Sequence, residues 1–182
     1  ADNMGIIRGA QSKRRAGNRI ITTKTEHPAV LEPCAYMEKQ GFEVVYIDVD
    51  SKGCIDMEQL ESEVNDRTIL ISVMHVNNEL GSINPVAEIA KLKGNALFHS
   101  DAVQSYGKVD INAGGTDIDM ISVSGHKIHG PKGIGAIYVR RGVNVNPYIM
   151  GGGQEKNMRS GTENVPAIAG FVFSGVGIAV LT

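Results

Sequence analysis

A lysine stands directly after an apolar, β-branched run in the sequence. The run 120–123 is followed by Ser124, Gly125, His126 and Lys127, and a loop rich in glycine and proline comes next. In open α/β sheets, the carboxyl ends of the strands form the mouth where ligands bind. Desolvation of an amine there favours its neutral form, which attacks carbonyl carbons to form a Schiff base. A lone lysine after a strand is more often an ordinary surface residue, so the interpretation depends on the other strands.

Three further strand-like segments also end on polar side chains. These residues are His27 after the first segment, Asn77, Asn78 and Glu79 after the third, and Asp101 and Gln104 after the fourth. Because the carboxyl ends of parallel strands meet at one edge of a sheet, we expect these side chains to gather beside Lys127. Each of them alone is more often structural, but four strands with the same ending favour a functional site.

The residue types in this group match the needs of one cofactor. An aspartate beside a cationic heterocycle keeps the ring nitrogen protonated, and a lysine can form an imine. An imidazole can stack on the ring or shuttle a proton, while serine and histidine donors can bind phosphate. A protonated pyridine, an imine-forming lysine and a phosphate anchor together describe pyridoxal phosphate. We therefore favour a pyridoxal-phosphate site over a metal site or a hydrolase.

The competing sites have weaker support. His126-x-x-His129 and His99-x-Asp101 could ligate a metal, but nothing supplies a strong third ligand, so no metal is expected. Ser124 near His126 could indicate a hydrolase, yet the G-x-S-x-G elbow is absent. The glycines of GPKGIG precede a strand and do not match the dinucleotide pattern G-x-G-x-x-G. We expect them to form a flexible loop that lets the backbone approach the cofactor site.

The composition is that of an ordinary globular domain. The 182 residues are 42% hydrophobic and 21% charged, and the formal net charge of -2 gives no reason to expect nucleic acid or a membrane surface as partner. No stretch approaches the roughly 20 apolar residues of a spanning helix. Cys34 and Cys54 lie far apart and outside any CxxC, so we expect neither a zinc site nor a disulfide. A reducing, cytoplasmic compartment fits this cysteine usage.

Strand-like and helix-like segments alternate along the chain. The expected strands are 19–25, 42–49, 68–76, 96–99, 120–124 and 134–140. This alternation predicts an α/β fold with a mostly parallel central sheet and helices on both faces. The link between the last two strands is too short for a helical crossover, so the last strand should be antiparallel. We also expect Pro33 to delay the start of its helix and Asn84 to cap the helix that follows it.

Five segments of the sequence resemble a single family. They are TEHPAV, MHVNNELG, HSDAVQSYGK, SVSGHKIHGPKGIGAIYVRR and GGGQEKNMRSGTEN, and they match it in both order and spacing. They closely resemble the cysteine desulfurases of the nitrogenase and housekeeping iron–sulfur class. These are pyridoxal-phosphate enzymes of the class V aminotransferase-like fold, also called fold type I. The GPKG and RSGT forms look more like this group than like the related desulfurase and selenocysteine lyase branch.

The resemblance implies a role for each candidate residue. Lys127 matches the family's Schiff-base lysine, and Asp101 matches the partner of the pyridine nitrogen. His27 matches the residue that stacks on the ring and assists proton transfer, so the implied catalytic residues are Lys127 and His27. The other implied cofactor ligands are Gln104 and Asn78 near the phenolic oxygen, Ser124 and His126 at the phosphate, and Thr162 at the phosphate of the partner subunit. The last of these implies a homodimer.

The implied reaction converts L-cysteine to L-alanine and leaves the sulfur as a persulfide on an enzyme cysteine. That sulfur supplies iron–sulfur cluster assembly, with scaffold and sulfur-acceptor proteins as partners. A related aminotransferase and a non-catalytic dimerising or docking module of the same fold are the alternatives.

The resemblance also implies that the chain is part of a larger protein. The family's glycine-alanine-threonine phosphate loop is expected before residue 1. The nucleophilic cysteine and the arginine that binds the substrate carboxylate are expected beyond residue 182, and neither Cys34 nor Cys54 matches the nucleophile. We therefore expect residues 1–182 to form one domain, the central part of the pyridoxal-phosphate-binding large domain. The N-terminal segment and the C-terminal small domain would be missing, and the chain alone should be inactive.

Overall fold

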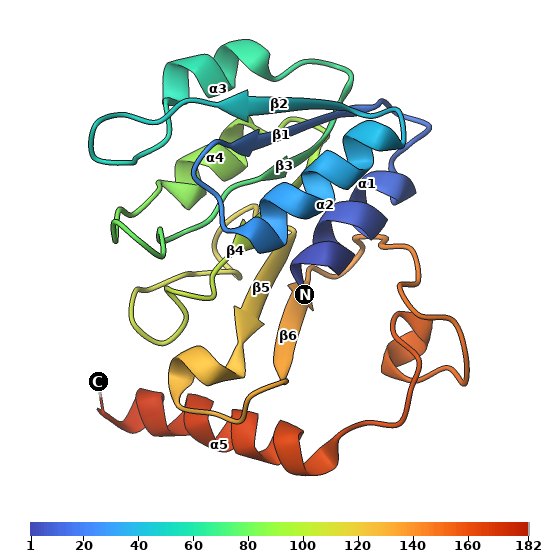
Figure 1. Cartoon of the computed structure of the whole chain (residues 1–182), viewed down its shortest axis with the longest axis vertical. Coiled ribbons are helices and arrows are strands. Elements are labelled where there is room, and N and C mark those ends of the chain that lie inside the picture. Colours follow the sequence, from blue (N-terminus) through green and yellow to red (C-terminus); the bar gives the residue numbers. More distant parts are fainter. Residues whose placement is uncertain (182) are drawn as a thin grey trace.

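Six strands form one sheet in the order β2-β1-β3-β4-β5-β6 (Figure 1). A computed structural model of the chain describes residues 1–181. The strands are β1 (Arg19–Thr23), β2 (Glu43–Ile47), β3 (Thr68–Ser72), β4 (Leu97–Asp101), β5 (Met120–Ser124) and β6 (Gly135–Val139). Neighbouring strands are parallel except for β5 and β6, which are antiparallel. The predicted α/β class, the mostly parallel sheet and the antiparallel last strand are confirmed.

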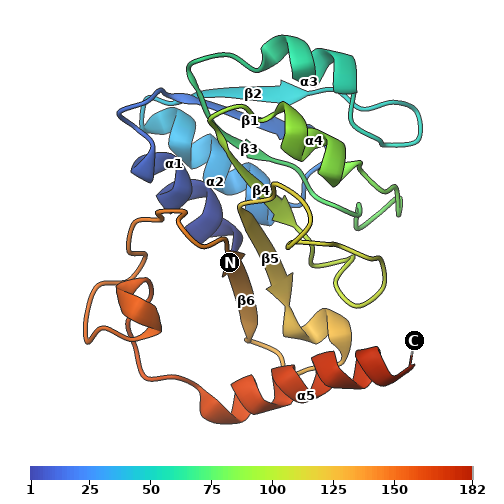
Figure 2. The ribbon, with the colours of Figure 1, turned by 180° about the vertical axis from the view of Figure 1, so that it is seen from behind.

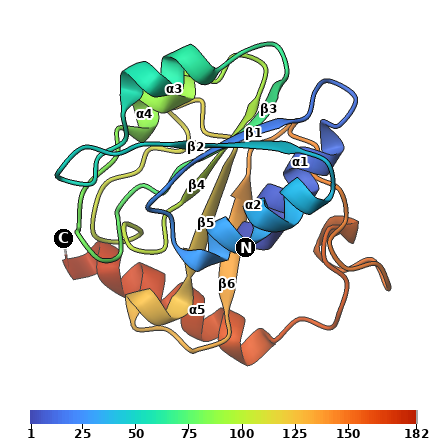
Figure 3. The same ribbon diagram turned by 45° about the horizontal axis from the view of Figure 1, so that its top comes forward.

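Helices cover both faces of this sheet. They are the π-helical turn η1 (Met4–Arg8), α1 (Gly9–Ser12), α2 (Pro28–Lys39), α3 (Met57–Glu63), α4 (Val86–Leu92), the 3-10 turns η2 (Gly125–Ile128) and η3 (Glu155–Asn157), and α5 (Val165–Leu181). The helices α1 and α2 lie on one face and α3 and α4 on the other, while α5 runs past η2 at the end of β5 (Figures 2 and 3). Within residues 1–181, no helix is long and apolar enough to cross a membrane.

The strands β1 to β5 contribute side chains to two hydrophobic cores, one on each face of the sheet. Ile20 and Leu70 pack with α1 and α2, whereas their neighbours Ile21 and Ile71 pack with α3 and α4. Successive side chains of a strand point to opposite faces, so a sheet covered on both sides has an almost continuous apolar sequence. The strand β3 is buried along its whole length for this reason.

The helix α2 begins earlier than the sequence predicted. It starts at Pro28, and Pro33 lies inside it rather than before it. His27 caps the helix, because its Nδ1 accepts a hydrogen bond from the backbone N–H of Ala29 at 3.1 Å. A proline inside a helix removes one backbone hydrogen bond. Here Pro33 is on the buried face with Cys34, so packing against the core offsets that loss.

Asn84 does not cap α4 as expected. Pro85 occupies the capping position, and the Asn84 side chain is buried between two loops. Its Oδ1 accepts a hydrogen bond from the N–H of Ile55 at 3.0 Å, and its Nδ2 donates to the carbonyl of Met74 at 2.9 Å. Buried backbone groups need hydrogen-bond partners, and this one amide satisfies two of them.

A buried carboxyl joins the end of β1 to the segment after β3. The hydroxyl of Thr23 and the N–H of Met74 both donate to Oε1 of Glu26 at 2.9 Å. Among the described residues, Oε2 has no hydrogen-bond partner. Burial is the main cause that raises the pKa of Glu26 to about 8. The carboxyls of Asp101 and Asp2 also raise this pKa, whereas the two hydrogen bonds lower it. The folded chain therefore holds Glu26 in its neutral form at pH 7.

Glu26→Gln should remove a pH-dependent loss of stability. In the unfolded chain Glu26 loses its proton near pH 4.5, while the folded chain retains it up to about pH 8. Between these values the folded state binds more protons, so wild-type stability falls as the pH rises, by up to about 1.4 kcal/mol per pH unit from this group. We expect urea denaturation to show a shallower decline for Glu26→Gln than for wild type.

The exposed Glu61 on α3 provides the control for this experiment. Glu61→Gln makes the same replacement of a carboxyl by an amide at an exposed position, so the stability of this variant should decline with pH as steeply as that of wild type. Equal pH dependence for wild type and Glu26→Gln would contradict the assignment of a buried proton to Glu26.

Candidate active site

A cavity of about 390 Å³ lies at the carboxyl ends of β1, β3, β4 and β5. These four strands are adjacent in the sheet, so residues far apart in the sequence meet there. The cavity is lined by all but one of the residues that sequence reasoning named as the site: His27, Asn78, Asp101, Gln104, Ser124, His126 and Lys127.

The exception is Thr162, which lies outside this cavity. It is exposed, and it follows Gly161, whose φ of 130° is a conformation that favours glycine. The preceding segment with η3 lies beyond β6, on the side of the sheet away from β4 (Figures 1 and 2). Within this chain, Thr162 is therefore not brought together with the other predicted residues.

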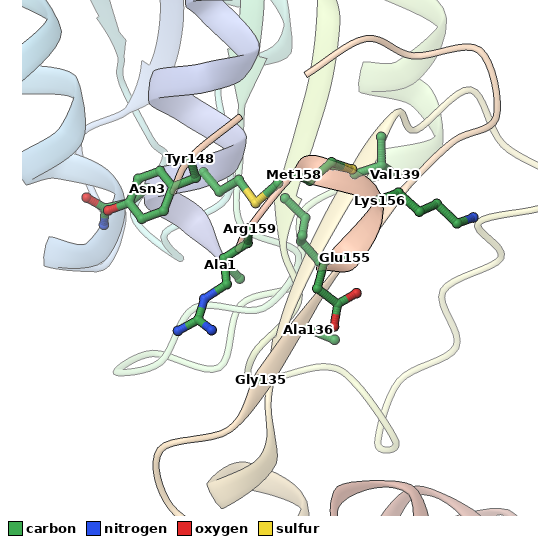
Figure 4. A pocket seen from close by; sticks show the side chains of 12 residues that line it. Ala1, Asn3, Gly135, Ala136, Val139, Tyr148, Glu155, Lys156, Met158 and Arg159 are labelled. Atoms are coloured by element: carbon green, nitrogen blue, oxygen red, sulfur yellow. The ribbon is translucent and has the colours of Figure 1, made fainter. Parts of the chain in front are cut away.

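A larger cavity of about 730 Å³ has a different lining. It lies between η1, β6 and the segment 148–159, and Figure 4 shows Tyr148, Glu155, Met158 and Arg159 among its side chains. None of the eight predicted site residues lines it. Because the smaller cavity combines a buried carboxyl, an amine and two imidazoles, we assign the candidate active site to the smaller one.

The carboxyl of Asp101 ends β4 and lies largely buried at this cavity. Its Oδ1 accepts a hydrogen bond from the N–H of Val103 at 2.8 Å, and Gln104 follows in the same turn. Burial, with the nearby Asp2 carboxylate, raises the pKa of Asp101 to about 7. In the described part of the chain, no lysine or arginine forms an ion pair with it. A cation entering the cavity would therefore supply the missing charge.

Lys127 is presented by the 3-10 turn η2 directly after β5. Buried Ile128 anchors the end of this turn. Gly125, also buried, begins the turn where neighbouring atoms leave no room for a side chain. A Cβ on Gly125 would lie 2.8 Å from Cγ2 of Ile134, so a larger residue would displace the turn. The Lys127 side chain is half-buried and, among residues 1–181, makes no hydrogen bond or ion pair. Its amine is thus available to a ligand in the cavity.

Two groups beside Lys127 can bind an anion. The hydroxyl of Ser124 and Nδ1 of His126 lie 2.7 Å apart and line the same cavity. A hydroxyl and an imidazole can both donate hydrogen bonds to oxygens of a phosphate or carboxylate. This end of the cavity therefore suits an anion, while the Asp101 end suits a cation.

His27 and Asn78 are positioned by hydrogen bonds of the turns that carry them. Because Nδ1 of His27 accepts the capping hydrogen bond, the neutral ring carries its proton on Nε2. The turn that carries Asn78 is held by the buried Asn77, whose Nδ2 donates to the carbonyl of Thr25 at 3.0 Å. Oδ1 of Asn77 accepts from the N–H groups of the next two residues after Asn78, both at 2.9 Å. Asn77 is thus structural and Asn78 lines the cavity.

The glycines of the loop after η2 do not approach the cavity as predicted. None of them lines it. The N–H of Gly130 donates to the carbonyl of Gly125 at 2.9 Å, and Gly133 has a φ of 80°. A Cβ on Gly135 would lie 2.6 Å from the carbonyl oxygen of Val123. Gly135 thus permits the close antiparallel approach of β6 to β5, while Gly130 and Gly133 shape the loop that leads to it.

Sequence reasoning missed two acidic residues that act on this site. Asp2 lines the cavity, and Glu26 lies close enough for the Asp101 carboxylate to help keep Glu26 protonated. Asp2 is so far from the other residues in sequence that no local pattern could have found it. His99 was considered only as a metal ligand, and no group of three His, Cys, Asp or Glu side chains within residues 1–181 could hold a metal ion. Its place two residues before Asp101 on β4 is the signal that it shares a face with that carboxyl.

Comparisons with known proteins agree on one family. Residues 2–174 match the family model of the aminotransferases of class V. The cysteine desulfurase IscS of Dictyoglomus turgidum is 46% identical over 172 residues, which are 93% of this chain and 44% of that relative. The chain therefore spans less than half the length of this curated relative.

Solved structures share the fold over nearly the whole chain. A NifS-like protein superposes with a TM-score of 0.94 at 41% identity, covering 97% of this chain and 50% of its own. A structure described as SspA in complex with cysteine has a TM-score of 0.89 at 41% identity, covering 98% of this chain and 52% of its own. Together with the six-stranded sheet and the cavity at its strand ends, these matches show that the chain belongs to the class V aminotransferase family.

Proposed function

We propose that this chain is the central part of a pyridoxal-phosphate-dependent cysteine desulfurase. The observation that carries the proposal is one cavity lined by the Lys127 amine and by the Asp101 carboxyl, which forms no ion pair with a lysine or arginine of residues 1–181. The class V aminotransferases and NifS-like desulfurases are pyridoxal-phosphate enzymes, and the similar IscS protein is named a cysteine desulfurase. In this proposal, residues 1–182 form a single domain of the larger enzyme.

The residues around the cavity fit this cofactor. Within residues 1–181, no lysine or arginine forms an ion pair with the Asp101 carboxyl, and a protonated pyridine nitrogen would provide that positive charge. Ser124 and His126 offer hydrogen-bond donors to a phosphate, and Lys127 offers the amine that links covalently to an aldehyde. Asn78 and Gln104, which line the same cavity, are amides able to donate to a phenolic oxygen.

Bound in this way, pyridoxal phosphate supplies an electron sink that stabilises negative charge on carbons attached to its imine. The chain's own residues would orient the group and move protons. His27 holds a proton on Nε2 because Nδ1 accepts the N–H of Ala29, and His27 lines the cavity. Nε2 is therefore the atom through which His27 would give or take a proton.

L-cysteine is the proposed substrate, and its sulfur is the group transferred. The Cβ–Sγ bond of the substrate breaks, the sulfur passes to a thiol as a persulfide, and L-alanine remains. This exchange balances without an external oxidant or reductant. The SspA structure described above, which is similar to this chain, contains cysteine and so supports this substrate. Iron–sulfur scaffold and sulfur-acceptor proteins are the proposed partners downstream.

Neither cysteine of this chain suits the role of sulfur acceptor. Cys34 is fully buried on the inner face of α2, and burial raises the pKa of its thiol to about 12. Cys54 lies in the turn after β2, and neither thiol lines the candidate active site. The reacting species would be a thiolate, which must come from elsewhere in the larger protein. Both cysteines are free, which fits the proposed cytoplasmic compartment.

A homodimer is part of this proposal. Thr162 lies in an exposed segment beyond β6 and outside the cavity of its own chain. This position supports a role for Thr162 at the phosphate of a second subunit rather than its own.

Cofactor binding can be tested with the purified chain and the variant Lys127→Ala. We expect added pyridoxal phosphate to give the yellow absorbance band of a lysine imine, and borohydride to fix the cofactor to the wild-type chain by reducing that imine. Lys127→Ala should lose both, because the amine is removed. The control is Lys132→Ala, an exposed lysine in the following loop that does not line the cavity, which should behave as wild type. Equal fixation by Lys127→Ala and wild type would contradict the proposed site.

Because neither thiol of this chain lines the cavity, we expect the chain by itself to have no desulfurase activity. Incubated with L-cysteine and pyridoxal phosphate, the chain should release no alanine beyond that of the cofactor alone, because neither thiol reaches the cavity. The IscS protein of Dictyoglomus turgidum serves as the positive control in the same alanine assay. Alanine release that disappears in Cys54→Ser would show that Cys54 is an acceptor after all.

A further inference from the structure

A buried histidine links three strands directly below the candidate active site. Nδ1 of His99 lies 2.9 Å from the hydroxyl of Ser72 on β3, and Nε2 lies 2.8 Å from the hydroxyl of Ser122 on β5. All three side chains are fully buried. His99 and Asp101 are two residues apart on β4, so their side chains share a face of the sheet. The ring is thus held by Ser72 and Ser122 on the face of β4 that also carries the carboxyl of the site.

The two serines do not decide which ring nitrogen carries the proton. A hydroxyl can donate or accept, so Ser72 and Ser122 accommodate either neutral tautomer of His99. Burial lowers the pKa of His99 to about 4, so the ring is neutral at pH 7. The tautomer must therefore be selected by a third group.

That third group is the carboxylate of Asp2. Its Oδ1 lies 3.6 Å from Nε2 of His99, and it is buried without a hydrogen-bond partner among the described residues. A carboxylate oxygen only accepts hydrogen bonds, so it favours a proton on Nε2 and is repelled by a lone pair there. With the proton on Nε2, Nδ1 accepts the hydroxyl proton of Ser72.

The helical turn that follows Asp2 packs against the His99 ring. A Cβ on Gly5 would lie 2.8 Å from Cδ2 of His99, so the backbone of η1 rests directly against the ring. Asp2 precedes this turn and lines the cavity together with Asp101. Its negative charge is one of the causes that raise the pKa of Asp101, after burial.

We propose that Asp2 and His99 are positioning residues, which fix a second negative charge beside Asp101 and so make the cavity select a protonated ring nitrogen. This inference rests on the proposed function for the identity of the ligand. The carboxylate of Asp2 acts at a distance and through His99, and the proposal gives it no covalent role. Two carboxylates at one wall favour a cation more strongly than Asp101 alone would.

The other charged and titratable groups around Asp101 do not replace Asp2. They are the amino group of Ala1, Glu26 and His27 before α2, His75 after β3, and His126 and Lys127 on η2. Glu26 is held neutral by burial, and the N–H of His75 donates to the carbonyl of Asp101 rather than to its carboxyl. The Ala1 amino group acts in the opposite direction and lowers the pKa of Asp101.

The first test is nitrogen-15 NMR of the histidine rings in the cofactor-free chain. We expect the His99 ring to be neutral and protonated on Nε2 in the wild type. Asp2→Asn should increase the population protonated on Nδ1, since the charge that favours the other tautomer is removed. The control Asp66→Asn, on the exposed loop before β3, should leave the ring unchanged. A wild-type His99 protonated on Nδ1 overturns the proposal, and this measurement needs no variant to fold.

The second test follows the charge at the site itself. In a carbon-13 NMR titration, Asp2→Asn should lower the pKa of Asp101, while Asp66→Asn should not. In a binding titration, Asp2→Asn should weaken the affinity for pyridoxal phosphate about tenfold, as expected for the loss of one nearby charge. An unchanged pKa of Asp101 or an unchanged affinity overturns the proposal.

The two proposals can fail separately. If the wild-type chain takes up no pyridoxal phosphate while both NMR results are as expected, the claim that residues 1–182 bind the cofactor is wrong and the positioning of Asp101 by Asp2 and His99 stands. If the cofactor binds but Asp2→Asn leaves the Asp101 titration unchanged, the positioning role is wrong and the proposed function stands.

Discussion

The burial of a carboxyl without a cation is the constraint on which the candidate site depends. Asp101 ends a strand that lies between β3 and β5, where water cannot solvate its charge fully. Burying an unpaired charge is costly, and the group responds by taking up a proton, as the raised pKa values of Asp101 and Glu26 show. A site built in this way gains most from a ligand that brings its own positive charge. The remaining cavity residues orient such a ligand.

The rest of the fold holds the Asp101 carboxyl and the Lys127 amine in place at the cavity. Parallel strands bring four chain segments to one edge, and structural side chains then fix the turns that leave it. Asn77 holds the turn that carries Asn78, and the capping bond of His27 both starts α2 and decides which ring nitrogen bears a proton. The same side chains that stabilise the fold therefore prepare the site. Placing functional groups on such constrained turns limits their movement before a ligand arrives.

Much of the fold could be predicted because its signals are local. Apolar runs separated by helical segments indicate a covered parallel sheet, and the short link before 134–140 requires an antiparallel last strand. The start of α2 and the role of Asn84 could not be predicted, because both depend on packing partners. Pro33 is tolerated through its burial against the core, and Asn84 bonds to Ile55 and Met74 in other segments. The intrinsic conformational preference of a residue is overridden where its tertiary contacts stabilise the folded state by more than that preference.

The sequence by itself determined that polar residues following four strands gather at one cavity, because the carboxyl ends of parallel strands meet at one edge. Only the tertiary structure decided the charge of that cavity. The protonation of Glu26, the tautomer of His99 and the nearness of Asp2 to Asp101 all depend on atoms from distant segments. The position of Thr162 outside the cavity was likewise decided by the path of the chain beyond β6. Electrostatic interactions depend on the distance between charges and on their burial, and both quantities are known only once the chain has folded.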